Sequence, residues 1–148
     1  MDIQPIEKWN MAYGKDGHEL YSDIGLHLGC FLEKLSDNVK RSNPVIRKNG
    51  KSAVLDVVLY NRNELQDALQ LSENLSDEEL LFEYIDRQGA DALKNVNGDF
   101  AGAIYNETKN TLLLFRDHMG VRPLFFQQTD DFVAFSTDLR GITALPEA

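Results

Sequence analysis

Cysteine is almost absent from this sequence of 148 residues, which has a single thiol at Cys30. One cysteine excludes an internal disulfide, so the chain is not a small disulfide-stabilised scaffold. The 3 histidines lie far apart in the sequence, and no metal site is expected from them. We therefore expect a hydrophobic core to stabilise the chain, for which 148 residues are sufficient.

Long apolar runs and basic clusters are also missing. No run approaches the roughly 20 apolar residues that span a bilayer, and residues 1–5 lack the layout of a signal peptide. Lys and Arg number 15 against 24 Asp and Glu, which gives a formal net charge of −9. A chain of this charge repels phosphate groups. These absences favour a cytoplasmic protein that binds neither nucleic acid nor a membrane.

The first half of the chain contains two strand patterns. Residues 1–23 show no clean period, whereas apolar residues alternate with others from residue 24 to Leu32. Residues 36–51 are polar and indicate a loop with a short edge strand at Val45 and Ile46. The apolar run Ala53–Tyr60 indicates a central strand that is covered on both faces.

Two helix starts follow this run. Asn61 and Ser76 are each followed three positions later by a glutamate, which is the spacing of a capping box. The second predicted helix ends at Gly89, because glycine is favoured at the position after a helix. A short helical piece is expected over residues 90–96.

The last third of the chain contains short apolar segments separated by polar turns. This spacing predicts an antiparallel meander. Strands, then segregated helices, then strands again predict an α+β fold with sheets packed face to face. The segments are residues 100–105, 111–115, 124–127 and 132–136.

Four motifs follow one another in the second half of the chain. They are Ser76-Asp77-Glu78-Glu79, Asn97-Gly98-Asp99-Phe100-Ala101, Arg116-Asp117-His118-Met119-Gly120-Val121-Arg122-Pro123-Leu124 and Ala134-Phe135-Ser136. In this order they resemble the class II glutamine amidotransferase domain of asparagine synthetases. The resemblance covers about residues 52–145, and the Arg-Asp-x-x-Gly-x-x-Pro-Leu run is its specific part.

The resemblance implies an N-terminal-nucleophile hydrolase fold, a four-layer αββα sandwich of two antiparallel sheets. Residues 1–148 would form one such domain at the N-terminal end of a longer asparagine-synthetase-like chain. In that family a cysteine directly after the initiator methionine attacks the amide of glutamine, with its own α-amino group as base. An Asn-Gly pair stabilises the oxyanion. An upstream arginine and the Asp of the Ser-Asp motif hold the charged end of glutamine, and the ammonia passes to a synthetase domain.

Most of that machinery is missing from this chain. Asp2 follows Met1 in place of the cysteine, and residues 28–32, where the upstream arginine is expected, contain none. The family's Asn-Gly pair falls on Asp56 and Val57. Asp56 replaces an amide donor with a negatively charged acceptor, and Val57 replaces the glycine that lets substrate approach the backbone. Losing one oxyanion donor costs roughly 10²–10³ in rate, so we predict that glutaminase chemistry is lost.

Asp77 is the one family site residue that remains. It is either a ligand for an amino group or an acid in the first turn of a helix, where the helix dipole favours negative charge. Arg116, Asp117, Gly120 and Pro123 form the structural signature turn of the family. The alternative for this turn is a docking surface for a following domain.

Cys30 and His118 carry no predicted chemistry. On a strand, Cys30 shares a face with Leu26, Leu28 and Leu32, which favours a buried core thiol over a Cys-His pair. His118 lies within the signature turn, and the sequence offers no second metal ligand beside it.

We therefore predict a non-catalytic domain that supports or regulates an attached asparagine-synthetase-like domain, in a parent protein that is a carbon-nitrogen ligase. No cofactor is expected in this domain. ATP and Mg are expected only in the C-terminal synthetase domain, which is the predicted partner in cis, and a homodimer is left open. The alternatives are an active glutaminase whose nucleophile lies upstream of Met1 or at Cys30, and a free-standing interaction module.

Overall fold

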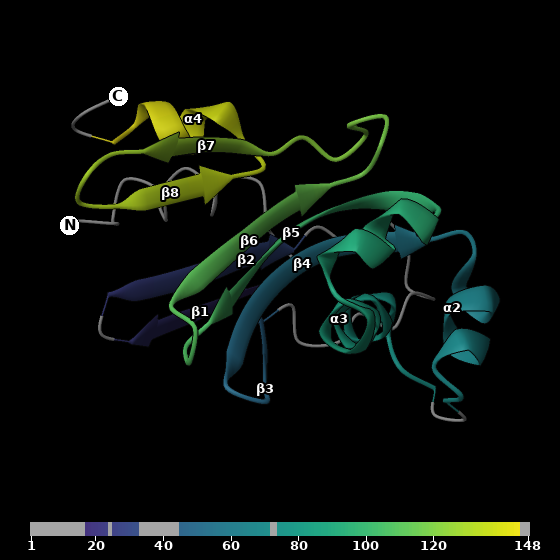
Figure 1. Ribbon diagram of the computed structural model, residues 1–148. Coiled ribbons are helices and arrows are strands. Elements are labelled where there is room, and N and C mark those ends of the chain that lie inside the picture. Colours follow the sequence, from purple (N-terminus) through teal and green to yellow (C-terminus); the bar gives the residue numbers. More distant parts are fainter. Residues whose placement is uncertain (1–16, 24, 33–44, 72–73, 146–148) are drawn as a thin grey trace.

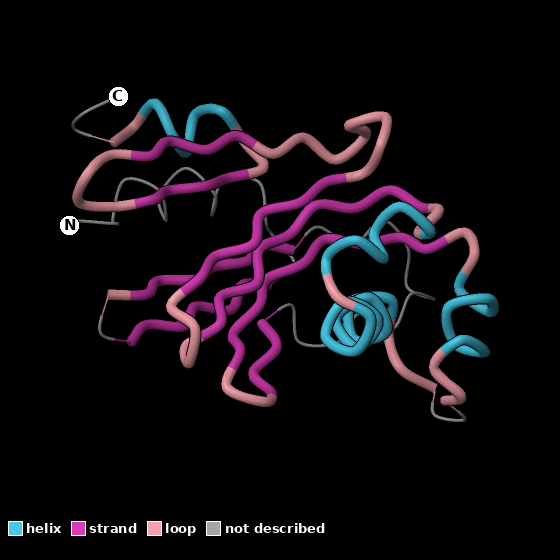
Figure 2. Tube along the Cα trace, in the orientation of Figure 1, coloured by secondary structure: helices cyan, strands magenta, loops and turns pink. Residues whose placement is uncertain are grey.

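The fold is described from a computed structural model, which covers residues 17–23, 25–32, 45–71 and 74–145, with the backbone alone at 17–19 and 30–32. Helices and antiparallel strands form an α+β structure (Figures 1 and 2). The elements are β1 (Gly17–Asp23), β2 (Leu26–Leu32), β3 (Val45–Lys48), β4 (Lys51–Leu59), α2 (Arg62–Ala68), α3 (Asp77–Gln88), η1 (Ala90–Asn95), β5 (Gly98–Asn106), β6 (Thr111–Arg116), β7 (Phe125–Gln128), β8 (Val133–Ser136) and α4 (Leu139–Thr143).

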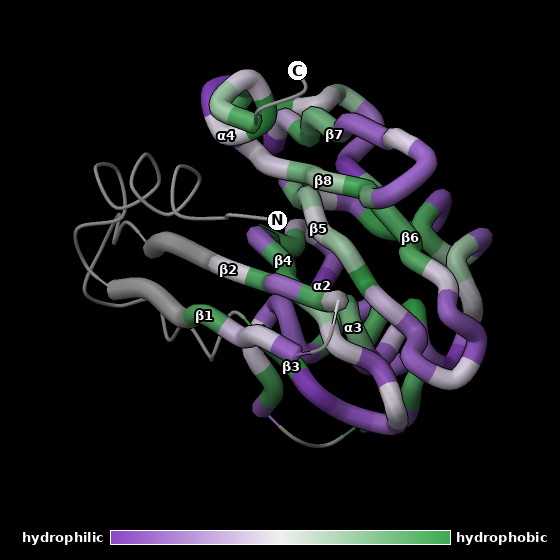
Figure 3. Tube along the Cα trace, turned by 90° about the vertical axis from the view of Figure 1, so that its left-hand side faces the viewer, coloured by the Kyte–Doolittle hydropathy of each residue, from purple (hydrophilic) through white to green (hydrophobic). Residues whose placement is uncertain are grey.

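The main sheet has the strand order β3-β4-β5-β6, and β4 pairs with β5 along its whole length. Alternate residues of β4 are buried and join the hydrophobic core together with apolar residues of α3, which packs on β4. Figure 3 colours the chain by hydropathy and shows green, hydrophobic stretches along β5 and β6. The buried residues of β4 on this face are Ala53, Leu55, Val57 and Leu59.

The hairpin of β1 and β2 lies on the other face of the main sheet, away from α3 (Figure 1). The guanidinium of Arg47 on β3 lies 4.2 Å from the centre of the Tyr21 ring on β1, an attractive cation–π geometry. Strands β7 and β8 form a second hairpin, on which α4 packs. Helices therefore cover one face of the main sheet, and strands lie against the other.

The caps of α3 confirm the prediction from the sequence. The Ser76 hydroxyl accepts a hydrogen bond from the Glu79 N–H at 3.2 Å, and the Glu79 carboxylate accepts one from the Ser76 N–H at 2.8 Å. Gly89 ends the helix with a φ of 85°, which favours glycine. The cap of α2 differs, because the Asn61 side chain makes no cap bond and instead contacts the backbone of Asn95 and Asn97, at 2.9 Å each.

Two predictions about the elements are wrong, and a third is confirmed. Strand β1 lies where the sequence shows no clean period, whereas the short helical piece expected over residues 90–96 is present as a 3₁₀ helix at Ala90–Asn95. The four late strands are not one meander, because β5 pairs with β6 and β7 with β8, and no pairing of β6 with β7 occurs among the described residues. The segment 117–124 leaves the sheet between them. Strand β2 and the edge strand at Val45 are confirmed.

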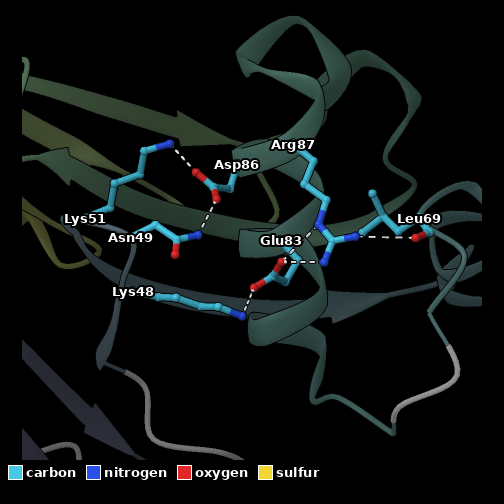
Figure 4. A network of polar contacts seen from close by, with 7 residues as sticks. All are labelled: Lys48, Asn49, Lys51, Leu69, Glu83, Asp86 and Arg87. Carbon is cyan, nitrogen blue, oxygen red and sulfur yellow. Dashed lines mark hydrogen bonds and ion pairs between the residues drawn. The ribbon is translucent and has the colours of Figure 1, made fainter.

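Polar contacts join the β3–β4 hairpin to α3 (Figure 4). The buried Glu83 carboxylate accepts from Lys48 at 2.5 Å and from Arg87 at 3.1 Å. Asp86, one turn further, forms an ion pair with Lys51 and accepts from the Asn49 amide at 2.9 Å. Each carboxylate has more than one donor, which is what burial of a charge requires.

Truncating the core of α3 is expected to cost far more than truncating an exposed leucine. Phe82 is 1% exposed and lies in the main core, whereas Leu139 is 52% exposed. Phe82→Ala should lower the free energy of unfolding by about 3–5 kcal/mol because it removes buried area and leaves a cavity. Leu139→Ala should change it by less than about 1 kcal/mol. Urea denaturation of both variants measures the difference, and equal losses would contradict this packing.

Candidate functional site

Asp56 and Val57 lie on opposite faces of β4. Val57 is 5% exposed and belongs to the core beneath the helices. Asp56 stands on the face opposite α3, which we call the outer face and define by Asp56, Val58, Asp99, Ala101 and Arg116 of β4, β5 and β6. Of the two residues Asp56 and Val57, Asp56 alone places its side chain on the outer face. The side chain of Val57 packs in the core on the opposite face.

Arg122 pairs with Asp56 across the outer face. Its Nη1 lies 3.4 Å from the Asp56 Oδ2, and the side chains are 28% and 33% exposed. The Nε of Arg122 is buried and has no hydrogen-bond partner. The charge of the Asp56 carboxylate on β4 is thus compensated by Arg122, which lies in the loop that follows β6.

A second carboxylate of the outer face is also occupied. The Tyr60 hydroxyl donates to Asp99 Oδ2 at 2.6 Å, and Val58 is the cross-strand partner of Asp99. This hydrogen bond to the Asp99 carboxylate raises the pKa of the exposed Tyr60 hydroxyl above its ordinary value. Tyr60 therefore remains a neutral hydrogen-bond donor at physiological pH.

Asp77 begins α3 and holds two other segments. Its Oδ2 accepts from the backbone N–H of Leu59 at 2.8 Å, and its Oδ1 forms an ion pair with Arg62. The Arg62 guanidinium also donates to the carbonyl of Leu75. Asp77 lies in the first turn of α3, as the structural interpretation predicts, and its role as a ligand for an amino group stays a prediction.

Asp117 organises the signature turn from its centre. It is 4% exposed, and its carboxylate accepts from four backbone N–H groups: Phe100 at 3.3 Å, Met119 at 3.0 Å, and Val121 and Arg122 at 2.9 Å each. Its own N–H donates to the Phe100 carbonyl at 2.7 Å. The turn is therefore bonded to the start of β5, and Arg122 is held where it meets Asp56.

The electrostatics and backbone of this turn follow from those bonds. Burial raises the pKa of Asp117, but the backbone N–H donors outweigh it, and the pKa lies below its ordinary value. Gly120 has a φ of 68°, a conformation that favours glycine, and the Arg116 side chain passes beside it at 3.5 Å from where a Cβ would stand. Pro123 leads out of the turn toward β7.

Two of the residues discussed from the sequence lie wholly or partly outside the described residues. Asp2 and the side chain of Cys30 are outside them. In the described part of the chain, no three His, Cys, Asp or Glu residues gather in a way that could hold a metal ion. No helix of this part has the length and apolar character needed to cross a membrane.

The cationic and tyrosyl partners of the site were not found from the sequence. In the sequence Arg122 is only a member of the turn motif, and no pattern gives Arg62 or Tyr60 a role. Tyr60 meets Asp99 through the pairing of β4 with β5, Arg62 meets Asp77 where α2 approaches α3, and Arg122 reaches Asp56 from the loop after β6. A linear pattern contains none of these approaches. The one local signal among these three residues is the position of Arg62, two residues after the apolar run Ala53–Tyr60.

This fold and site define a class of protein. The sequence profile of the glutamine amidotransferase domain family matches residues 3–148, which is almost the whole chain. The chain belongs to this family, and within it the relatives are asparagine synthetases, so it is a class II glutamine amidotransferase domain of the asparagine synthetase type.

Two relatives come from Bacillus subtilis. Asparagine synthetase (glutamine-hydrolyzing) 3 is 35% identical over 94 residues, which cover 60% of this chain and 15% of the relative. Asparagine synthetase (glutamine-hydrolyzing) 2 is 24% identical over 136 residues, 90% of this chain and 18% of the relative. A Methanocaldococcus jannaschii relative is 30% identical over 112 residues, 75% of this chain and 20% of the relative. The chain thus spans a fifth or less of these relatives' length.

Replacing Asp117 is expected to loosen the turn. Asp117→Asn keeps the shape but points an amide N–H₂ at backbone donors, so it should lower the free energy of unfolding by about 3 kcal/mol. Asp131→Asn, which removes the same charge from an exposed turn, is the matched control and should cost less than about 0.5 kcal/mol. Chemical denaturation compares the two variants. Equal stabilities would show that Asp117 does not organise the turn.

The lowered pKa of Asp117 also predicts acid sensitivity. Because the folded protein binds this proton more weakly than the unfolded chain, the stabilisation is fully present at neutral pH. It should be lost progressively below about pH 5, as the pH falls through the unfolded and then the folded pKa. The free energy of unfolding between pH 6 and 3 should therefore fall less steeply in Asp117→Asn than in the wild type. Parallel curves would contradict the assignment.

Proposed function

We propose that this chain is a non-catalytic glutamine amidotransferase domain, which supports or regulates an asparagine-synthetase-like domain of the same polypeptide. That domain would use ATP and Mg to form an amide, and this domain would need no cofactor. The relatives support a longer parent protein, a carbon-nitrogen ligase, since the chain covers 15% to 20% of their length. The proposal places the protein in the cytoplasm.

The observation that carries the proposal is the carboxylate of Asp56 on the outer face, paired with Arg122 at 3.4 Å. Hydrolysis of an amide develops negative charge on the carbonyl oxygen, and an oxyanion site must present donors to it. Asp56 presents a carboxylate, which accepts hydrogen bonds and does not donate them. Its negative charge is compensated by the Arg122 guanidinium. The charges of Asp56 and Arg122 therefore balance each other on the outer face.

Val57 supports the proposal less than the sequence alone indicates, because its side chain packs into the core and does not stand on the outer face. The proposal therefore rests on the charge of Asp56, and the bulk of Val57 does not enter it.

The same proposal gives the complete domain the four-layer αββα architecture of the family. Helices α2 and α3 on one face of the β3–β6 sheet would supply a helix layer and a sheet. The β1–β2 hairpin on the other face would belong to the second sheet. The signature turn would be structural, and a homodimer stays a prediction.

An active glutaminase is the second candidate. The names of the Bacillus subtilis relatives, which describe them as glutamine-hydrolyzing, favour it. It needs a nucleophile upstream of Met1 or at Cys30, and it must tolerate a carboxylate at Asp56. A free-standing interaction module has no such specific support.

Release of glutamate and ammonia from L-glutamine by the purified chain tests the proposal. We expect a rate equal to that of buffer, for the wild type and for Cys30→Ser alike, with the Bacillus subtilis asparagine synthetase 3 as the positive control. Turnover above buffer would refute the non-catalytic assignment. If Cys30→Ser abolished that turnover, Cys30 would be the nucleophile.

A further inference from the structure

The sequence contains two Asn-Gly pairs, at residues 49–50 and 97–98, and the structure places them in different surroundings. An asparagine before a glycine is prone to spontaneous deamidation, because glycine has no side chain to shield its backbone nitrogen. That nitrogen attacks the side-chain amide of the asparagine. The main chain must rotate between the two residues for the attack, so the bonds that hold this peptide control whether the pair reacts.

Asn49 and Gly50 are the two central residues of the turn between β3 and β4. Lys48 pairs with Lys51 across the turn, and both central residues are exposed, with φ angles of 55° and 67°, as in the type I′ turns that favour Asn-Gly. A Cβ added at Gly50 would have one neighbour within 4 Å among the described residues, the Thr108 hydroxyl oxygen at 3.5 Å. The residue that supplies the attacking nitrogen is therefore not enclosed by neighbouring atoms.

The pair at residues 97–98 is held by the main chain. The Asn97 carbonyl accepts from the backbone N–H groups of Tyr60 and Asn61, at 2.8 and 3.3 Å, and the Asn97 N–H donates to the Asn61 side chain at 2.9 Å. Gly98 is the first residue of β5, and a Cβ added there would collide with the Val58 carbonyl oxygen. Rotation of this peptide breaks the bonds that join β4 to the start of β5, which opposes the reaction.

We infer that Asn49 is a site of spontaneous deamidation, and that the carboxylate it gains releases the β3–β4 turn from α3. The Asn49 Nδ2 donates to Asp86 Oδ2 at 2.9 Å, beside the ion pair of Asp86 with Lys51 (Figure 4). An aspartate at position 49 has no amide hydrogen to donate and places a second negative charge against Asp86. An isoaspartate also adds a carbon to the main chain of a two-residue turn, which disturbs the pairing of Lys48 with Lys51.

The reaction needs only water. The Gly50 nitrogen loses its proton to base in the solvent and bonds to the Asn49 Cγ. The bond from Cγ to Nδ2 then breaks, and ammonia leaves with a proton taken from the solvent. Water opens the resulting succinimide ring at either of its two carbonyl carbons. Asparagine and water thus become ammonia and either aspartate or isoaspartate, with no oxidation or reduction.

Peptide mapping by mass spectrometry, after incubation of the purified chain at mildly alkaline pH, tests the site. In the folded chain, Asn49 should be converted at least about tenfold faster than Asn97, because the folded backbone opposes only the second reaction. In urea the two rates should agree within about twofold, since the unfolded chain holds neither peptide. Asn49→Gly, which suits a positive φ and has no amide, should leave this turn unmodified.

Two results would overturn the assignment of the site. One is conversion of Asn97 as fast as that of Asn49 in the folded chain. The other is an Asn49 amide that stays intact in the folded chain over a time in which the chain in urea is converted. Neither result affects the glutaminase assay, because deamidation of the chain does not involve glutamine.

The release of the turn is tested with Asn49→Asp, which carries the product charge. It should lower the thermal unfolding midpoint by about 2 °C or more, and this loss should disappear when Asp86 is also replaced by alanine. Asn110→Asp is the matched control, because Asn110 also has a positive φ, of 49°, but its Oδ1 accepts from the Tyr105 hydroxyl at 2.8 Å. A carboxylate keeps that bond, so the midpoint should change by less than about 1 °C. An unchanged midpoint in Asn49→Asp, or an equal loss with and without Asp86, would show that the charge does not act through Asp86.

Discussion

The antiparallel pairing of β4 with β5, from Lys51 with Asn106 to Leu59 with Gly98, is the constraint on which the rest of the structure depends. It fixes which residues of the apolar run pack beneath α3 and which stand on the outer face. A shift of one residue would exchange the two sets. One register of β4 against β5 therefore determines both the core and the site. Val57 contributes to the core, and Asp56 contributes to the site.

The chain satisfies its own charges around this strand. Asp56 meets Arg122, Asp77 meets Arg62, and Asp99 accepts from Tyr60. The polar groups of these three pairs are directed at neighbouring segments of the same chain. Such contacts link the signature turn and both helices to β4. These groups therefore act as structural links between segments of the fold.

Much of the fold followed from local patterns. The capping box at Ser76, the end of α3 at Gly89 and the strand from Leu26 are encoded by neighbouring residues, and each was predicted. Strand β1 was missed because its residues show no clean period, and the separation of β6 from β7 depends on Asp117, whose partners include the distant Phe100. For the site, the sequence pointed to Asp56 and Asp77 through the family motifs. Their cationic partners come from other segments, so no linear pattern predicted them.

The central claim is that the Asp56–Arg122 pair has replaced an oxyanion site. A crystal structure of the chain soaked with L-glutamine tests it most directly. The account predicts that Arg122 remains within ion-pair distance of Asp56 and that no glutamine density lies over the outer face. Density for a glutamine whose side-chain carbonyl oxygen accepts hydrogen bonds on this face, with the ion pair broken, would contradict it.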